Sequence, residues 1–245
     1  MKAMTKFFSL LLVLCVLGSC VLFTACSDKP EEPEEPSVPA KEADPETTVQ
    51  VEGGQIAGYS EDGLYIYKGI PFMAQPVGEL RWQDPRPAEA WEGVKDCVEF
   101  GANFYQPKSA AGEPYTAEFL IDNDLGISEE GISMNIWAPA DLSEAKEVLV
   151  YIHGGALMSG SGSIEIYSGE ELAKQGIVCV TFNYRLGNFG KFACTELSAR
   201  SDSGGSGNYS LKDCVAALEW VQENISAFGG DPDKVTIMGQ SAGAG

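Results

Sequence analysis

The sequence predicts an α/β fold: a mostly parallel sheet with helices on both of its faces. Two continuous apolar runs, at residues 148–152 and 177–182, are typical of strands that are covered on both sides. A helical pattern at 209–227 follows the second run, and a further strand is expected at 234–238. Strands that alternate with helices in this way favour a parallel sheet.

The remaining elements follow from local pattern. Apolar residues recur at helical spacing within 209–227, at Leu211, Val215, Leu218 and Ile225, and the FGG at 228–230 ends this helix. A short helix is expected at 170–175 and a strand at 134–138. Asp62-Gly63 between two apolar runs predicts a hairpin. Residues 71–130 are rich in Pro, Gly and polar groups, which predicts long loops with short helices.

The composition and net charge of the chain limit the kinds of partner that it can bind. The chain has 245 residues, 44% of them apolar, which is enough for one large domain with a core. Its formal charge is −20 and its pI is about 4.3. Nucleic acids and anionic membrane surfaces attract clustered Lys and Arg, so this balance argues against both as partners.

Residues 1–26 are predicted to be a lipoprotein-type signal peptide. Two lysines precede an apolar run, and Thr24-Ala25-Cys26 supplies the small residues of a processing site. We expect lipid attachment at Cys26, because the polar residues after it suit the start of a mature chain. Cys20 is a competing processing site, and a true transmembrane anchor is the alternative to a signal peptide.

Residues 27–46 are predicted to be a disordered acidic tether, because they repeat Pro and Glu and offer almost nothing to bury. The folded domain is expected at 47–245. Together these segments predict an exported cell-surface lipoprotein, anchored to the membrane by its lipid, with secretion as the alternative. No metal site is expected, since the spacing of the cysteines in the mature chain matches no zinc pattern: Cys97, Cys179, Cys194 and Cys214.

Two motifs carry the chemistry. GQSAG at 239–243 is a GxSxG motif directly after a predicted strand, as a sharp turn that projects the Ser241 hydroxyl requires. HGGA at 153–156 follows another buried strand, where backbone N–H groups can point into a cavity and stabilise an oxyanion. Either motif alone is weak evidence, but both together, in this order and context, point to a serine hydrolase.

The chain resembles the type-B carboxylesterases, the α/β-hydrolase family that includes cholinesterases and para-nitrobenzyl esterases. The matched blocks run from about Thr48 to the end, in the family's order: YKGIPF at 67–72, PVGELRW at 76–82, NIWAP at 135–139, NYRLG at 183–187 and FGGDP at 228–232. The resemblance implies hydrolysis of a small-molecule carboxylic ester without a cofactor, with Ser241 as nucleophile and the N–H groups of Gly155, Ala156 and Ala242 as oxyanion donors.

The resemblance also implies two structural ion pairs, Arg185 with Asp213 and Arg81 with Glu129. This sequence departs from the family in several places. Phe104 and Gly131 stand where many members have the two halves of a disulfide, and Gln240 stands where Glu is usual. Ser210 and Cys214 also replace the usual Gly and Gln, which bears on local packing.

The family is about twice as long, and its acid and His follow the nucleophile. The only histidine here is His153, in the glycine loop, so we expect a fragment of a serine carboxylesterase that is inactive by itself. The alternative is a non-catalytic cell-surface binding module on the same fold. Such members usually lose the nucleophile, and this chain keeps it, which favours the enzyme.

Overall fold

The computed structural model describes residues 41–108, 118–119, 121 and 124–245. Residues 41–245 form one compact unit. The predicted signal peptide, Cys26 and the tether up to residue 40 lie outside the described residues. Within the described part, no helix is both long and apolar enough to cross a membrane. Asp44 donates its backbone N–H to Gly58 O at 2.8 Å, so the last residues assigned to the tether pack on the domain.

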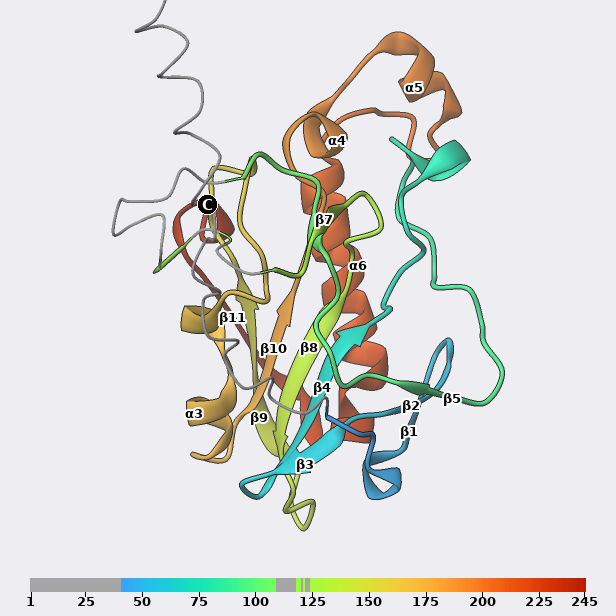
Figure 1. Cartoon of the computed structure of the whole chain (residues 1–245). Helices are drawn as coiled ribbons and strands as arrows, with labels where there is room; N and C mark the ends of the chain where they lie inside the picture. The colour runs from blue at the N-terminus through green and yellow to red at the C-terminus, as the bar shows by residue number, and fades with distance from the viewer. Residues whose placement is uncertain (1–40, 109–117, 120, 122–123) are drawn as a thin grey trace, which may run out of the picture. The chain divides into compact units, whose positions relative to one another are not determined.

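A six-stranded sheet organises the fold (Figure 1). Its spatial order is β11 (Gly230–Gly239), β9 (Lys146–Ile152), β10 (Val178–Phe182), β8 (Met134–Pro139), β4 (Leu64–Ile70) and β3 (Tyr59–Glu61). Two smaller sheets flank it: β1 (Val49–Val51), β2 (Gly54–Ala57) and β5 (Val94–Asp96), then β6 (Asn103–Phe104) with β7 (Ile127–Ser128).

The large sheet is mixed, which corrects the expectation of a mostly parallel one. β9 pairs in parallel with both β10 and β11, whereas β10–β8, β8–β4 and β4–β3 are antiparallel. The hairpin at Asp62-Gly63 forces the antiparallel pairing of β3 with β4. The parallel half is therefore the one that carries the two motifs.

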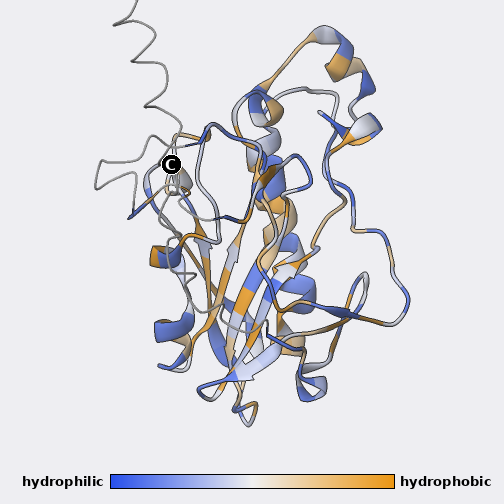
Figure 2. Ribbon diagram, viewed as in Figure 1, coloured by the Kyte–Doolittle hydropathy of each residue, from blue (hydrophilic) through white to orange (hydrophobic). Residues whose placement is uncertain are grey.

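Helices cover both faces of the sheet, as expected. The long helix α6 (Tyr209–Asn224) packs Ala217, Trp220 and Val221 against the face that carries Val148 and Val150. The short helix α3 (Glu170–Ala173) covers the other face, where Trp137 and Cys179 lie. Figure 2 shows the apolar residues concentrated along the central strands between these layers.

The rotation of α6 differs from the apolar pattern in the sequence. Leu211 and Val215 are 50% and 52% exposed, although they belong to the apolar repeat. The buried face instead includes Asp213, whose side chain is fully buried. Asp213 turns inward because Arg185 provides a buried partner, and this carries Leu211 and Val215 to the outside. The helix also ends earlier than 227: residues Ile225–Phe228 form a 3-10 turn.

Two more short helices lie between β10 and α6: α4 (Gly187–Lys191) and α5 (Thr195–Arg200). α4 braces the glycine loop, because Gly187 N–H donates to Leu157 O at 2.7 Å and Lys191 Nζ donates to Ala156 O at 3.1 Å. The loop after β9 is thus held from its outer side by this chain's own residues.

Candidate active site

The candidate nucleophile lies at a sharp turn after β11. Ser241 begins a 3-10 turn, Ser241–Gly243, and has φ of 53°, in the left-handed region that side chains other than glycine rarely adopt. The glycine at 239 is required here, because a Cβ on it would lie 1.9 Å from Gly243 O. A strained serine between a strand and a helical turn is the backbone geometry of a nucleophile elbow.

The glycine loop lies beside this elbow. β11 runs parallel to β9 with Gly239 opposite Ile152, so both strands end at the same edge of the sheet. Gln240 N–H donates to Ile152 O at 3.3 Å. A Cβ on Gly154 would lie 1.9 Å from Gln240 Oε1, so the loop and the residue before the serine are in direct contact.

The loop leaves two backbone donors free. Gly155 and Ala156 have φ of 106° and 57°, and neither N–H donates to an acceptor among the described residues. Ala156 is exposed and Gly155 half-buried. Free N–H groups that follow the C-terminal end of a strand can bind a developing negative charge. The third expected donor, Ala242, is the residue after the candidate nucleophile and lies in the 3-10 turn.

His153 is a buried, neutral part of the scaffold. Its ring stacks on Tyr184 with centroids 4.3 Å apart, and the Tyr184 hydroxyl donates to His153 O at 2.6 Å. Burial lowers the pKa of His153 to about 4. Nδ1 lies 2.8 Å from Gly154 O, a group that can only accept, so Nδ1 carries the proton. Nε2 is buried and has no partner in the described part of the chain.

The ion pair of Arg185 with Asp213 forms deep in the fold. The Arg185 guanidinium binds the carboxylate through Nε at 2.8 Å and Nη2 at 2.6 Å, and both side chains are at most 1% exposed. Burial raises the pKa of Asp213, while the bonds from Arg185 lower it. Arg185 Nη1 also donates to Gln83 O at 2.8 Å, which ties the loop after β4 to this centre.

The ion pair of Arg81 with Glu129 also forms, but nearer to the solvent. Nε and Nη2 of Arg81 lie 2.7 and 3.1 Å from the two carboxylate oxygens. The two side chains are 39% and 24% exposed. This pair connects two parts of the loop region between β4 and β8.

The sequence is similar to those of known esterases. The family model described as "Carboxylesterase family" matches residues 45–245. The chain belongs to the carboxylesterase family. Fumonisin B1 esterase of Sphingopyxis macrogoltabida is 40% identical over 84% of this chain, and para-nitrobenzyl esterase of Bacillus subtilis (strain 168) is 43% identical over 80%.

Solved structures confirm the α/β-hydrolase fold. A structure of PNB esterase matches 80% of this chain with a TM-score of 0.72 and 40% identity. The chain covers 39% of that protein's chain, and 37% and 38% of the two esterases named above. It therefore spans less than half of the length of these relatives.

Two departures from the family have structural explanations. Phe104 and Gly131 lie side by side, since a Cβ on Gly131 would be 2.7 Å from Phe104 N. Phe104 is 1% exposed and packs in the apolar core, where Gly131 leaves room for its backbone. Ser210 donates to Arg185 O at 2.5 Å, so it adds a bond to the buried centre.

No group of three or more metal-binding side chains occurs among the described residues. The four cysteines in the described part of the chain are free, and burial raises the pKa of the Cys97, Cys179 and Cys214 thiols to about 12. Such thiols stay protonated and are poor nucleophiles.

The structure adds one site feature that the sequence does not reveal, the contact of Gln240 with Gly154. The Gln240 Oε1 atom is buried without a partner among the described residues. The motif marks the position before the serine, but it does not say which way that side chain turns.

Proposed function

We propose that the protein hydrolyses carboxylic esters through an acyl-serine intermediate formed on Ser241. The observation that carries this proposal is the left-handed backbone of Ser241 beside a loop with free N–H groups. Strain of this kind presents a hydroxyl at the tip of a turn. The esterase relatives support an ester as the substrate class.

In the proposed reaction the Ser241 oxygen attacks the ester carbonyl as a base removes its proton. The N–H groups of Gly155, Ala156 and Ala242 bind the oxyanion that forms. The alcohol then leaves with a proton from the same base, and water hydrolyses the acyl-serine to release the acid.

We propose that the base is a histidine, held by an acid, in a continuation of the chain beyond Gly245. His153 does not suit this role, because it is buried, its Nδ1 proton bonds Gly154 O and its pKa is about 4. The share of the relatives' length that this chain leaves uncovered provides room for both groups.

Turnover of a short-chain nitrophenyl ester tests this assignment. The complete gene product should hydrolyse the ester, and Ser241→Ala should lower kcat by about 10⁴- to 10⁶-fold. Ser143→Ala, which changes an exposed serine after β8, should have no effect. The 245-residue chain alone should show no turnover above background. Absence of turnover by the complete gene product would favour a binding module instead, and undiminished turnover by Ser241→Ala would show that Ser241 is not the nucleophile.

We also propose that the protein is exported and lipid-anchored through Cys26, on the evidence of the sequence of residues 1–26 alone. Mass spectrometry of the mature N-terminus tests this proposal. A diacylglyceryl group on an N-terminal Cys26 is the expected result. A mature chain that starts at Cys20, or that retains Met1, would show that the assignment is wrong.

A further inference from the structure

The outer face of α6 carries a stripe of residues spaced by four: Leu211, Val215, Glu219 and Glu223. This spacing places them on one side of the helix. The first two are half-exposed apolar side chains, and the two glutamates are exposed. The stripe is therefore apolar near the start of the helix and acidic near its end.

The stripe forms one wall of a groove of about 620 Å³. The opposite wall comes from the loop after β4, where Pro85 and Pro87 lie. Small-molecule sites in proteins have volumes of roughly 300–1,000 Å³ and mostly apolar linings. A stable complex with a folded protein buries about 800 Å² of surface on each partner, which is a broad contact area. A groove with the volume of a single small-molecule site therefore suits a small molecule better.

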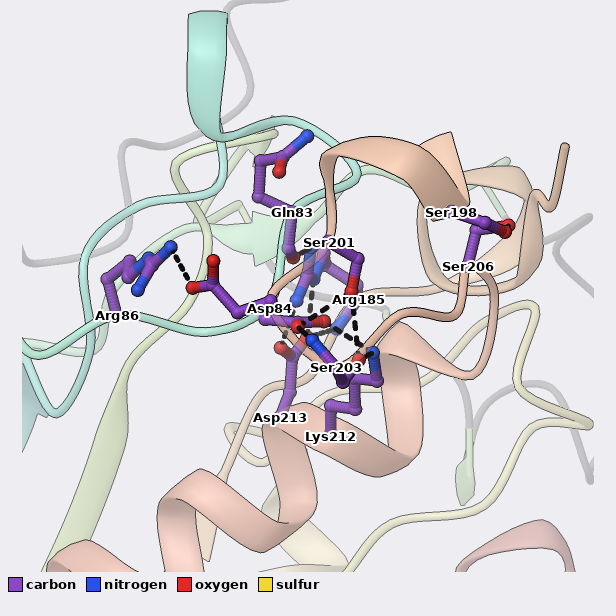
Figure 3. Close-up of polar contacts among 11 residues, drawn as sticks. Gln83, Asp84, Arg86, Arg185, Ser198, Ser201, Ser203, Ser206, Lys212 and Asp213 are labelled. Atoms are coloured by element: carbon purple, nitrogen blue, oxygen red, sulfur yellow. Dashed lines mark hydrogen bonds and ion pairs between the residues drawn. The ribbon is translucent and has the colours of Figure 1, made fainter. Parts of the chain in front are cut away.

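A polar network fixes the two walls relative to each other (Figure 3). Asp84 accepts hydrogen bonds from Lys212 Nζ, from Ser201 Oγ at 2.9 Å and from Ser203 N–H at 3.3 Å. Burial would raise the pKa of Asp84, but these bonds outweigh it and lower the pKa to about 2. Asp84 therefore stays charged and bonded, which keeps the groove preformed.

The charges that line the groove are unevenly paired. Its cations are neutralised: Lys212 pairs with Asp84, and Arg86 Nη2 lies 2.5 Å from Asp202. At the other end the groove is lined by the carboxylates of Glu52, Glu219 and Glu223. None of these three takes part in an ion pair with another described residue. The groove thus has an apolar end at Leu211 and Val215 and a negative end at the three glutamates.

The position of Glu219 and Glu223 is unfavourable for the helix itself. Like charges four residues apart repel each other, and both lie in the last turns of α6, where the helix dipole disfavours negative charge. A bound cation would relieve both effects. We propose that the groove binds a small organic cation that has an apolar body, its charged group lying between the glutamates and its apolar part on Leu211 and Val215.

Hexyltrimethylammonium is a suitable probe, with tetramethylammonium and hexanesulfonate as matched controls that remove the chain or reverse the charge. Binding to the full chain is measured by equilibrium dialysis at low salt. We expect one saturable site for hexyltrimethylammonium and at least tenfold weaker binding of both controls. Equal binding of tetramethylammonium would reflect only the −20 charge of the chain, and it would overturn the proposal.

Variants then locate the site. Leu211→Ser with Val215→Ser should weaken hexyltrimethylammonium binding by about tenfold or more. Glu219→Gln and Glu223→Gln should each weaken it by up to about fivefold, and their effect should vanish at high salt. The Glu variants should also raise the melting temperature of the free protein. Glu196→Gln on α5 and Leu172→Ser on α3 are matched surface controls.

Two results would refute the proposal. One is unchanged hexyltrimethylammonium binding in all groove variants. The other is a shift from oligomer to monomer in the Leu211→Ser, Val215→Ser protein with probe binding unchanged, which would make the groove a contact between copies. Because binding is measured without an ester, the outcome does not depend on the role of Ser241.

Discussion

The two sides of the candidate site are built very differently. On the β10 side, the glycine loop rests on buried groups: His153 stacked on Tyr184, and Arg185 paired with Asp213. On the β11 side, Ile237 and Met238 are 55% and 51% exposed, although they belong to the strand that leads to Ser241. The first side is fixed by packing within this chain, whereas the second has packing on only one edge of its strand.

This difference predicts where the described fold is sensitive to change. A buried charge cannot lose its partner without a large penalty, because no water replaces the lost bond. A half-exposed side chain can be changed with little loss of stability. Substitutions on the β10 side should therefore lower the free energy of unfolding, and those on β11 should alter association instead.

The largest effect is expected at Asp213. Asp213→Asn leaves the Arg185 guanidinium buried without a counter-charge, which should lower the free energy of unfolding by about 3–5 kcal/mol. Urea denaturation at neutral pH measures this loss. Glu219→Gln, an exposed change on the same helix, is the control and should not destabilise the chain. A loss below about 1 kcal/mol for Asp213→Asn would contradict the account of this side.

His153 predicts a pH dependence. Its pKa is about 4 when folded and about 6.5 when unfolded, so the unfolded chain binds the proton more readily as the pH falls. Stability from this group is complete above pH 6.5 and is lost between pH 6.5 and 4. The free energy of unfolding should fall by about 2 kcal/mol from pH 7 to pH 5.

The control for this prediction is His153→Asn, which removes the chain's only histidine. The variant will be less stable at pH 7, but its stability should change much less between pH 7 and pH 5. An equal fall in both proteins would mean that other groups titrate in this window and that His153 does not take part.

These contrasts also show what the sequence could predict. The elbow and the glycine loop were predictable, because each follows a short apolar strand and contains glycines where the backbone passes too close to other atoms for a Cβ. The rotation of α6 was not, since hydropathy treats Asp213 as a surface residue. Only the fold brings Arg185 to it and turns Leu211 and Val215 outward.

Strand direction was also beyond the sequence pattern. The apolar runs identify strands, but which strands become neighbours depends on how the chain connects them. β8 lies between β4 and β10, both antiparallel to it, and no local feature of residues 134–139 indicates this. The contact of Gln240 with Gly154 was hidden for the same reason, because it joins the ends of two strands that are distant in sequence.

A smaller effect is expected at the second ion pair. Arg81 and Glu129 are partly exposed, so water can replace their bonds and salt can screen their charges. A double-mutant cycle with Arg81→Gln and Glu129→Gln should give a coupling energy of about 1 kcal/mol or less. The coupling should shrink in 1 M salt. A coupling energy as large as the loss of unfolding free energy expected for Asp213→Asn would contradict the distinction between buried and exposed ion pairs.

The smallest change in stability is expected on β11, together with a change in association. β11 is an edge strand of the sheet in the described structure, and Ile237 and Met238 point to its opposite faces while both remain half-exposed. An edge with unpaired backbone groups and apolar side chains is a template for pairing with another chain. The 245-residue chain should therefore self-associate as its concentration rises.

Ile237→Lys with Met238→Lys should suppress this association, because charges on an edge strand oppose pairing. The same change should alter the free energy of unfolding by less than about 0.5 kcal/mol. Sedimentation velocity across a concentration series measures the association, with Leu172→Lys on α3 as the control for added charge. If the control suppresses association equally, net charge and not the β11 edge governs it.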